Sequence, residues 1–213
     1  MSIYFQIFIT LLSLLNPILA LSQYLNMTNG MSKEAKRSIA IVCGISVFGI
    51  LGGFLFLGSY IMEGLSIHEY SLRLGGGVIL LILGIKIILG DNAAHDRSGI
   101  DKPFEVKNVK AMGVSPLALP MIVGPASIVL VIVYSQDAPN LISKFIILLI
   151  LALLAAIIAV TFILADYIAK AVGEVGIVVI TKIMGLVVTA IAFEMIIAGL
   201  QTVMPMILKG SST

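Results

Sequence analysis

The sequence predicts an all-α membrane protein with six transmembrane helices arranged as two inverted-topology three-helix repeats, in which helices one and four are discontinuous. The chain is 60% hydrophobic and only 11% charged, whereas soluble domains carry about 25% charged residues. Six apolar runs approach or exceed the length of about 20 residues that crosses the hydrocarbon core of a bilayer. Two of these runs are interrupted by prolines 108 residues apart, Pro17 and Pro125.

The six apolar runs cover residues 3–25, 39–62, 71–90, 112–134, 143–167 and 177–206. The loops between them are short, except for a polar segment at 91–111. This segment divides the chain into a first repeat at 1–90 and a second repeat at 112–213. Because each repeat has an odd number of spans, the second must run inverted through the membrane. We expect one membrane domain overall, with 91–111 as a cytoplasmic linker.

The distribution of basic residues predicts the orientation, because cytoplasmic loops of membrane proteins are enriched in Lys and Arg. No basic residue precedes Lys33, so residues 3–25 are interpreted as a first span and not as a signal peptide. Ten of the 13 basic residues lie toward one side and three, Arg73, Lys144 and Lys209, toward the other. We therefore expect a multi-pass protein of the plasma (inner) membrane with both termini extracytoplasmic. The ten are Lys33, Lys36, Arg37, Lys86, Arg97, Lys102, Lys107, Lys110, Lys170 and Lys182.

The third span of each repeat supports the internal symmetry. With an offset of 109 residues, Arg73 aligns with Lys182 and Gly76 aligns with Gly185. Matches between isoleucines and valines continue along both spans, but these are common in membrane proteins. The basic residue and the glycine at a shared spacing are more specific.

The two proline breaks, Asn16-Pro17 and Gly124-Pro125, are the predicted substrate site, together with Pro120. Proline removes one backbone donor and frees a carbonyl, and such groups occur in a membrane only where protein or a polar cavity satisfies them. The start of one half-helix can bind an anionic group and the end of the other a cationic group. A small zwitterionic solute carries both. The alternative is a pair of simple kinks relieved by neighbouring helices.

Three further residues, Gly76, Gly185 and Ser127, are assigned to the same predicted site. The two glycines also fit close helix packing, which is the commoner role of small residues in membrane helices. Ser127 follows the Gly124-Pro125 break. A role for it as a protease nucleophile fails, because none of the predicted spans contains a histidine that could act as its base.

Glu194 is the candidate for proton or ion coupling. It lies within the apolar run 177–206, and an ionisable side chain inside a membrane helix is costly unless it faces the protein interior or is protonated. A neutral, hydrogen-bonded glutamate that only joins helices is the alternative. Arg73 and Lys182 are the candidate entrance charges for a substrate carboxylate. For these two residues the alternative is anchoring at the membrane interface.

Other classes of function lack the residues that they need. The chain has no G-x-x-x-x-G-K-[ST] motif for nucleotide hydrolysis. With a single cysteine it forms no intramolecular disulfide and no zinc cluster. We therefore predict a non-enzyme without cofactor or metal. Its expected partners are the bilayer and a small zwitterionic solute. The net charge of +2 is too small to indicate binding of nucleic acid. Packing by small residues fits a monomer and a homo-oligomer equally.

The same motifs resemble those of the MarC family of six-span inner-membrane proteins. The resemblance lies in Asn16-Pro17, in the segment from Pro116 to Pro120 with Gly124-Pro125, and in the glycine motifs around Gly76 and Gly185. It covers essentially the whole chain. The resemblance implies similarity to the LysE-type exporter superfamily and, from some members, transport of small neutral amino acids such as glycine and alanine. It places the site around Asn16, Pro17, Gly124 and Pro125.

This chain departs from the family pattern at two places. Leu19 and Ser22 stand where the first motif usually continues with glycine and a second proline, so the first helix is expected to be less broken than the fourth. In the last helix, Lys182 replaces a frequent arginine and Glu194 stands where glutamine is frequent. Proton coupling through Glu194 would then be particular to this branch of the family.

The sequence and the resemblance together predict a secondary active transporter of small neutral amino acids that works by alternating access. Export is one direction that such a transporter could take. Proton coupling and substrate exchange both remain open as the driving force. A non-transporting membrane scaffold or regulatory protein is the alternative. A channel is less favoured, because the spans supply too few polar residues for a continuous pore lining.

Overall fold

A computed structural model describes residues 3–89, 111–138 and 140–210 of the chain. Nearly all of these residues are helical, and none of them lies in a strand. In chain order the elements are α1 (Ile3–Leu15), α2 (Pro17–Met27), α3 (Lys33–Gly64), α4 (Glu69–Leu89), η1 (Gly113–Ile122), α6 (Pro125–Asp137), α7 (Leu141–Ile163) and α8 (Ala165–Gly210). The predicted all-α class is therefore confirmed for the described part of the chain.

Four of these helices are long and apolar enough to cross a membrane: α3, α4, α7 and the Val175–Pro205 part of α8. Two shorter helices, α1 and α6, are also apolar. The predicted linker at 91–111 lies outside the described residues except for Ala111. Its basic residues, Arg97, Lys102, Lys107 and Lys110, lie outside them as well, as does the side chain of Lys209.

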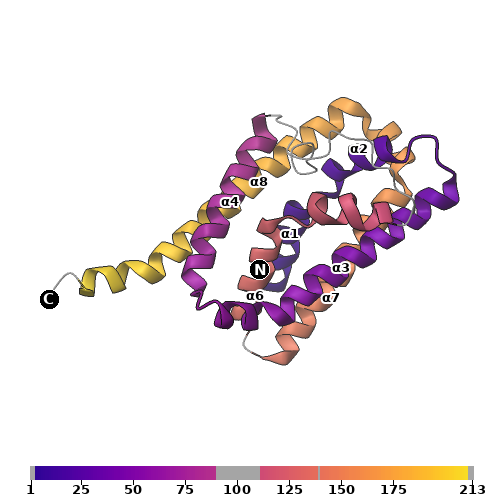
Figure 1. Ribbon diagram of the computed structural model, residues 1–213. Coiled ribbons are helices and arrows are strands. Elements are labelled where there is room, and N and C mark those ends of the chain that lie inside the picture. Colours follow the sequence, from indigo (N-terminus) through magenta and orange to yellow (C-terminus); the bar gives the residue numbers. More distant parts are fainter. Residues whose placement is uncertain (1–2, 90–110, 139, 211–213) are drawn as a thin grey trace.

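The helices pack as two outer pairs around a centre. Figure 1 shows α4 beside α8 on one side of the molecule and α3 beside α7 on the other, with α1, α2, η1 and α6 between them. The α4–α8 contact is the most extensive, and both η1 and α6 pack on α3. The start of α1, the α3–α4 turn and the α6–α7 turn lie at one end of this bundle, here called the N-terminal face. The α2–α3 turn and the start of α8 lie at the opposite face.

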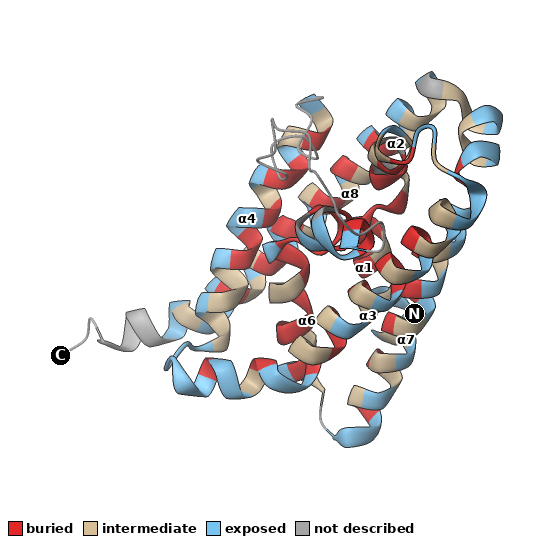
Figure 2. Cartoon of the chain, turned by 45° about the vertical axis from the view of Figure 1, so that its right-hand side comes forward, coloured by how far each residue is buried: buried red, intermediate tan, exposed pale blue. Residues whose placement is uncertain are grey.

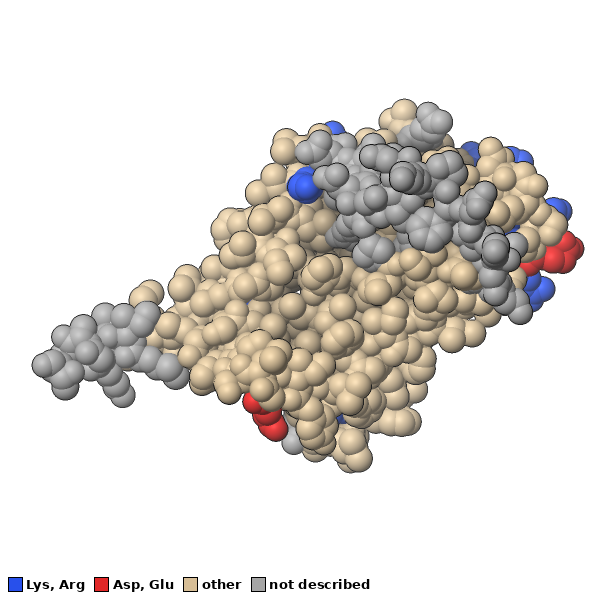
Figure 3. Space-filling view, in the orientation of Figure 1, with Lys and Arg blue, Asp and Glu red and all other residues tan. Residues whose placement is uncertain are grey.

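The described surface is apolar around the middle of the bundle. Buried residues lie along the sides of the helices that face one another (Figure 2), and large apolar side chains such as Val78, Leu149 and Leu186 are exposed on the outside. In Figure 3 uncharged side chains cover the middle of the visible face, while charged side chains lie toward its edges. This pattern matches contact with lipid, since extensive exposed apolar surface is rare on soluble monomers.

The helices break at residues that precede prolines. Asn16, before Pro17, has φ +39°. Gly124, before Pro125, has φ −92° and ψ 173°. Within η1, a segment with π-type turns, Ser115 and Leu119 are both extended, with φ of −134° and −128° and ψ of 128°. Each of these two also precedes a proline. The proline ring clashes with the preceding residue in the α conformation and disfavours that region, which accounts for these breaks.

The second break is larger than the first, as the departures at Leu19 and Ser22 predict. Around Asn16 the helical hydrogen bonds continue: its N–H donates to the Leu12 carbonyl at 3.1 Å, and its carbonyl accepts from Ala20 at 3.3 Å. Around Gly124 the ladder is interrupted, because the Val123 N–H bonds five residues back to Ala118 at 2.8 Å and α6 begins anew at Pro125.

Glycines let the helix backbones approach closely. A Cβ on Gly113 of η1 would lie 2.7 Å from the Ile39 carbonyl of α3, and one on Gly44 would lie 2.9 Å from the Ala155 carbonyl of α7. A Cβ on Gly185 of α8 would lie 2.8 Å from the Ile87 side chain of α4. Small residues at such crossings are the usual material of membrane helix interfaces.

Two predicted helix boundaries need correction. The fifth span, predicted at 143–167, ends at Ile163, and the next helix begins at Ala165 and turns sharply at Gly173, where φ is +67°. The second span, predicted at 39–62, begins at Lys33 because the Ser32 hydroxyl caps it by accepting from the Ala35 N–H at 3.2 Å. Both differences arise because local backbone geometry and capping, more than apolarity, end these helices.

Candidate functional site

A cavity of about 490 Å³ lies between α1, α4, α6, α7 and α8, and its lining includes Tyr4, Asp137 and Ser143 at the N-terminal face. We call it the Arg73–Glu194 cavity. Its polar lining comes from all five helices, and the rest of its wall is apolar. The lining residues are Ile3, Tyr4, Gln6, Ile7, Thr10, Arg73, Leu130, Val133, Tyr134, Asp137, Ala138, Ser143, Ile147, Val187, Ala190, Ile191, Glu194, Met195 and Ala198.

Arg73, in the second turn of α4, is held by two carboxylates. Its Nε donates to Glu69 Oε1 at 2.7 Å, one helical turn earlier. Its Nη2 contacts both oxygens of Asp137 on α6, at 2.6 and 2.7 Å. The Arg73 side chain is 18% exposed, against 44% for Glu69 and 39% for Asp137. The guanidinium therefore lies inside the wall of the cavity and joins α4 to α6, which a lipid-interface anchor would not do.

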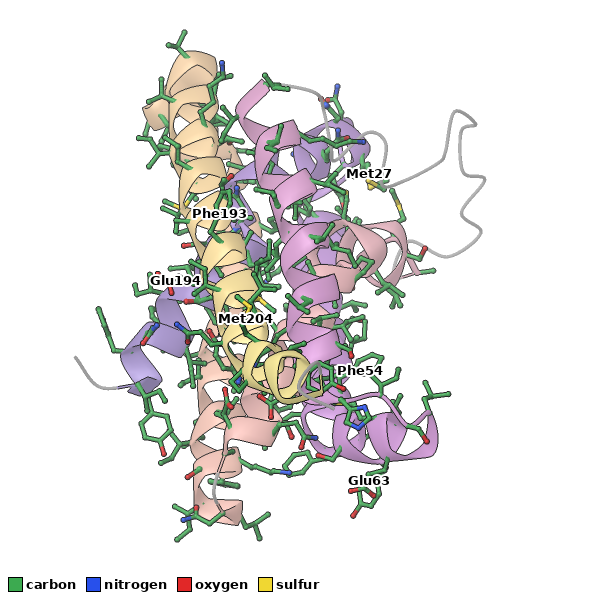
Figure 4. The ribbon with its side chains drawn as sticks, turned by 90° about the vertical axis from the view of Figure 1, so that its left-hand side faces the viewer. Met27, Phe54, Glu63, Phe193, Glu194 and Met204 are labelled. Carbon is green, nitrogen blue, oxygen red and sulfur yellow. The ribbon has the colours of Figure 1, made fainter. Side chains whose placement is uncertain are left out.

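Glu194 lies deeper in the same cavity than Arg73. A Cβ on Gly76 would lie 3.2 Å from Met195 Cε, and one on Gly77 would lie 3.0 Å from the Ala192 carbonyl. Glu194 is thus level with Gly76 and Gly77 of α4. These glycines lie three and four residues after Arg73, and at about 1.5 Å per residue this places Glu194 roughly one helical turn further into the cavity. Figure 4 shows Glu194 on the flank of α8 beside α1. Its side chain is exposed and has no hydrogen bond or ion pair with the described residues.

Other polar side chains fix the walls of the cavity. The Tyr4 hydroxyl donates to Ser143 Oγ at 3.3 Å, and Ser143 Oγ donates to Asn140 Oδ1 at 3.0 Å, so the start of α1 is tied to the start of α7. The side chains of Thr10 and Tyr134 hydrogen-bond to each other and tie α1 to α6. These bonds hold α1 against the helices around it and keep polar groups at the cavity surface.

The predicted residues of the helix breaks do not line this cavity. Asn16 and Pro17 are buried, as is Gly124, whereas Pro125 is exposed. The Ser127 hydroxyl is 1% exposed and donates to the Gly124 carbonyl at 2.8 Å, so it satisfies the backbone at the start of α6. The backbone of Pro120 lies in η1, and its side chain lies outside the described ones.

Gly76, Gly185 and Lys182 also lie away from the cavity lining. A Cβ on Gly76 would collide with Val129 of α6, and one on Gly185 would meet Ile87 and Ile88 of α4. In the structure both glycines are buried at helix crossings. Lys182 is exposed on α8, one turn before Gly185 and therefore near the end of α4 at the opposite face.

The opposite face is joined by contacts from four helices. Lys36 Nζ of α3 lies 3.4 Å from Asp166 Oδ1 of α8. Tyr24 of α2 donates from its hydroxyl to the Lys36 carbonyl at 2.8 Å. Its ring stacks on Phe162 of α7 with centroids 4.5 Å apart, and both rings are 1% exposed. Ionic, hydrogen-bonding and aromatic contacts therefore join α2, α3, α7 and α8 at this face.

The sequence misses the residues that complete the Arg73–Glu194 cavity. The spacing of Glu69 and Arg73, four residues apart on one helix, is a signal that was available. Asp137 lies 64 residues from Arg73, and no sequence pattern links the two. Among the described residues, no group of three or more His, Cys, Asp or Glu is arranged to hold a metal ion.

Comparison with known proteins identifies relatives along almost the whole chain. The UPF0056 membrane protein MJ1677 of Methanocaldococcus jannaschii is 29% identical over 195 residues, 91% of this chain and 94% of that protein. YhcE of Escherichia coli is 30% identical over 207 residues, 97% of this chain and 96% of its own. YvbG of Bacillus subtilis is 30% identical over 205 residues, 95% of this chain and 96% of its own.

These relatives carry the same description, UPF0056 membrane protein. No solved structure matches the chain. Residues 1–204, which include both helix breaks and the whole Arg73–Glu194 cavity, match the family described as MarC family integral membrane protein. The chain therefore belongs to the MarC family of integral, multi-pass membrane proteins.

Proposed function

We propose that the protein is a secondary active transporter of small neutral amino acids, such as glycine and alanine, that works by alternating access. The observation that carries this proposal is the contrast between the two ends of the bundle. A cavity of about 490 Å³ with charged and hydroxyl groups in its lining lies toward the N-terminal face, while aromatic and ionic contacts join the helices at the opposite face. A cavity toward one face, with contacts that join the helices at the other, fits one state of an alternating-access cycle.

Two inverted three-helix repeats are part of the proposal. Two helices pack against their counterparts from the other half of the chain, α4 on α8 and α3 on α7, whereas the half-helices around the breaks pack crosswise, α1 on α6 and α2 on η1. The glycine contacts support the same symmetry. Gly77 of α4 packs on Ile196 of α8, and Gly185 of α8 packs on Ile87 of α4. At the offset of 109 residues Ile87 corresponds to Ile196, and Gly185 corresponds to Gly76, the neighbour of Gly77. Each contact is therefore the symmetry mate of the other to within one residue.

The proposed orientation places the N-terminal face and both termini outside the cytoplasm. Six basic residues whose side chains are described lie toward the opposite face: Lys33, Lys36, Arg37, Lys86, Lys170 and Lys182. Two, Arg73 and Lys144, lie toward the N-terminal face. The positive-inside rule then makes the opposite face cytoplasmic, in the inner membrane of a bacterium. The Arg73–Glu194 cavity would open to the outside.

In this account the solute enters the cavity and moves to the central site between the helix breaks. At the start of α6 the backbone N–H proposed for its carboxylate is that of Ala126, since Pro125 has none and those of Ser127 and Ile128 donate to the Gly124 carbonyl. The break at Asn16-Pro17 lies in the other repeat. Rocking of one repeat against the other would release the Tyr24–Phe162 and Lys36–Asp166 contacts and open the cytoplasmic side. Coupling would come from protonation of Glu194 or from exchange, as in a LysE-type exporter.

A panel of ligands separates this proposal from a non-transporting scaffold. A ligand that binds the native state stabilises it, by about 2.7 kcal/mol at a concentration one hundred times its dissociation constant. We expect glycine and alanine to raise the midpoint of thermal unfolding of the detergent-purified protein in a saturable way. Glucose at the same concentration is the control. If the amino acids had no more effect than glucose, the proposed substrate class would be wrong.

A further inference from the structure

We propose that the Arg73–Glu194 cavity is a binding site for the primary ammonium group of a small solute, with the Glu194 carboxylate as its direct ligand. The inference deepens the proposed transport function and rests on it for the route of the solute. It concerns a site about one helical turn below the rim of the cavity, apart from the helix breaks. The ligand class is defined by the ammonium group, which amines and amino acids share.

The first step of the argument is that Glu194 has no partner in the described protein. Its neighbours on α8, Phe193 and Met195, are apolar, and no described side chain forms an ion pair or hydrogen bond with its carboxylate. An ionisable group within a membrane-spanning helix is costly and is normally paired or faces a polar cavity. Glu194 lines the cavity, so its missing partner is expected to come from there.

The second step is that Arg73 does not supply that partner. The guanidinium is the one basic group among the described residues that line the cavity, and Glu69 and Asp137 already bind it at 2.6–2.7 Å. The Asp137 carboxylate contacts it with both oxygens, and charge-assisted bonds of this kind are strong and geometrically specific. Among the charged side chains that line the cavity, two carboxylates, Asp137 and Glu194, therefore stand against one guanidinium. The cavity thus attracts a cationic group and disfavours an anion.

The third step is that the cavity suits a small ammonium ligand in size and lining. Its volume of about 490 Å³ lies within the usual range of about 300–1,000 Å³ for small-molecule sites. Tyr4 and Tyr134 both line it, and aromatic rings within about 6 Å of an ammonium group attract it through their π faces. Figure 4 shows the Glu194 side chain on the α1 side of α8, where the N-terminal helix borders the cavity.

Binding of three probe molecules to the full chain in lipid nanodiscs tests this site. Ethylamine carries only the ammonium group, acetate only the carboxylate, and glycine carries both. Isothermal titration is expected to show binding of ethylamine and glycine, with acetate at least tenfold weaker. Glu194→Gln should weaken ethylamine binding on the order of tenfold or more, because it removes a charge-assisted bond. Glu194→Asp, which keeps the charge, should retain part of the affinity.

Glu63→Gln is the matched control, since Glu63 is an exposed glutamate of α3 that does not line the cavity. It should leave both affinities unchanged. The proposal is overturned by acetate that binds as tightly as ethylamine, or by Glu194→Gln protein that remains monodisperse and binds ethylamine normally. Binding of ethylamine without glycine would support the ammonium site and contradict the amino-acid substrate of the proposed function. The two ideas therefore fail separately.

Discussion

Glu194→Gln is expected to abolish the accumulation of glycine driven by a pH gradient in proteoliposomes, while exchange of saturating glycine continues. Glutamine keeps the size and polarity of the side chain but cannot take up or release a proton. If Glu194 carries the coupled proton, its loss uncouples the gradient from the solute, while saturating glycine offsets the weaker binding expected of this variant and lets exchange continue. Uptake of radiolabelled glycine is measured with and without the pH gradient. Glycine exchange is measured in the same proteoliposomes.

Two variants complete the Glu194 experiment. Glu194→Asp keeps an ionisable group in the Arg73–Glu194 cavity and should retain gradient-driven uptake in part. Glu63→Gln removes a carboxylate outside the cavity and should behave as the unaltered protein. Gradient-driven uptake that is unchanged in Glu194→Gln would remove this residue from the coupling mechanism and leave substrate exchange as the driving force.

Gly113→Ala is expected to destabilise the protein by about 2–3 kcal/mol, the upper part of the range for overpacked sites. The new Cβ would lie 2.7 Å from the Ile39 carbonyl and 3.0 Å from the Cys43 N–H nitrogen. Both are backbone atoms of α3, so η1 and α3 must separate. For a chain of this size the midpoint of thermal unfolding should fall by roughly 4–12 °C. Because η1 leads into the break at Gly124, transport should fall as well.

Gly49→Ala is the matched control for this substitution. Gly49 lies in α3, the helix that Gly113 packs against, but a Cβ there would meet nothing within 4 Å. Alanine is also the better helix former, by up to about 1 kcal/mol. The unfolding midpoint of Gly49→Ala should therefore stay level or rise. Equal midpoints for Gly113→Ala and the unaltered chain would show that the η1–α3 approach is not tight.

The sequence predicts the helix breaks well, because proline acts on its immediate neighbour. Asn16 and Gly124 leave the helical region where Pro17 and Pro125 require it. The larger size of the second break also follows from the local sequence, since Pro120 adds an extended residue at Leu119. The all-helical class and four long spans follow from apolar run length, which the chain needs in order to cross a bilayer.

The candidate site is predicted only in part, because its geometry depends on contacts between distant segments. Arg73 and Glu194 stand out in the sequence as charges in apolar runs, but nothing there places them in one cavity. The ion pair between Arg73 and Asp137 joins residues 64 positions apart. The pairing of Lys36 with Asp166 spans 130 positions. Helix packing decides both, and no local pattern in the sequence links either pair.

Counterflow of glycine tests the central claim, transport by alternating access, most directly. Proteoliposomes loaded with unlabelled glycine are diluted into a trace of radiolabelled glycine, and the label inside is followed over time. A carrier that alternates between two faces should accumulate the label transiently above its external concentration, because unlabelled solute occupies the return step. Liposomes without protein provide the baseline. Label that enters the proteoliposomes no faster than this baseline would contradict the proposed transport of small neutral amino acids.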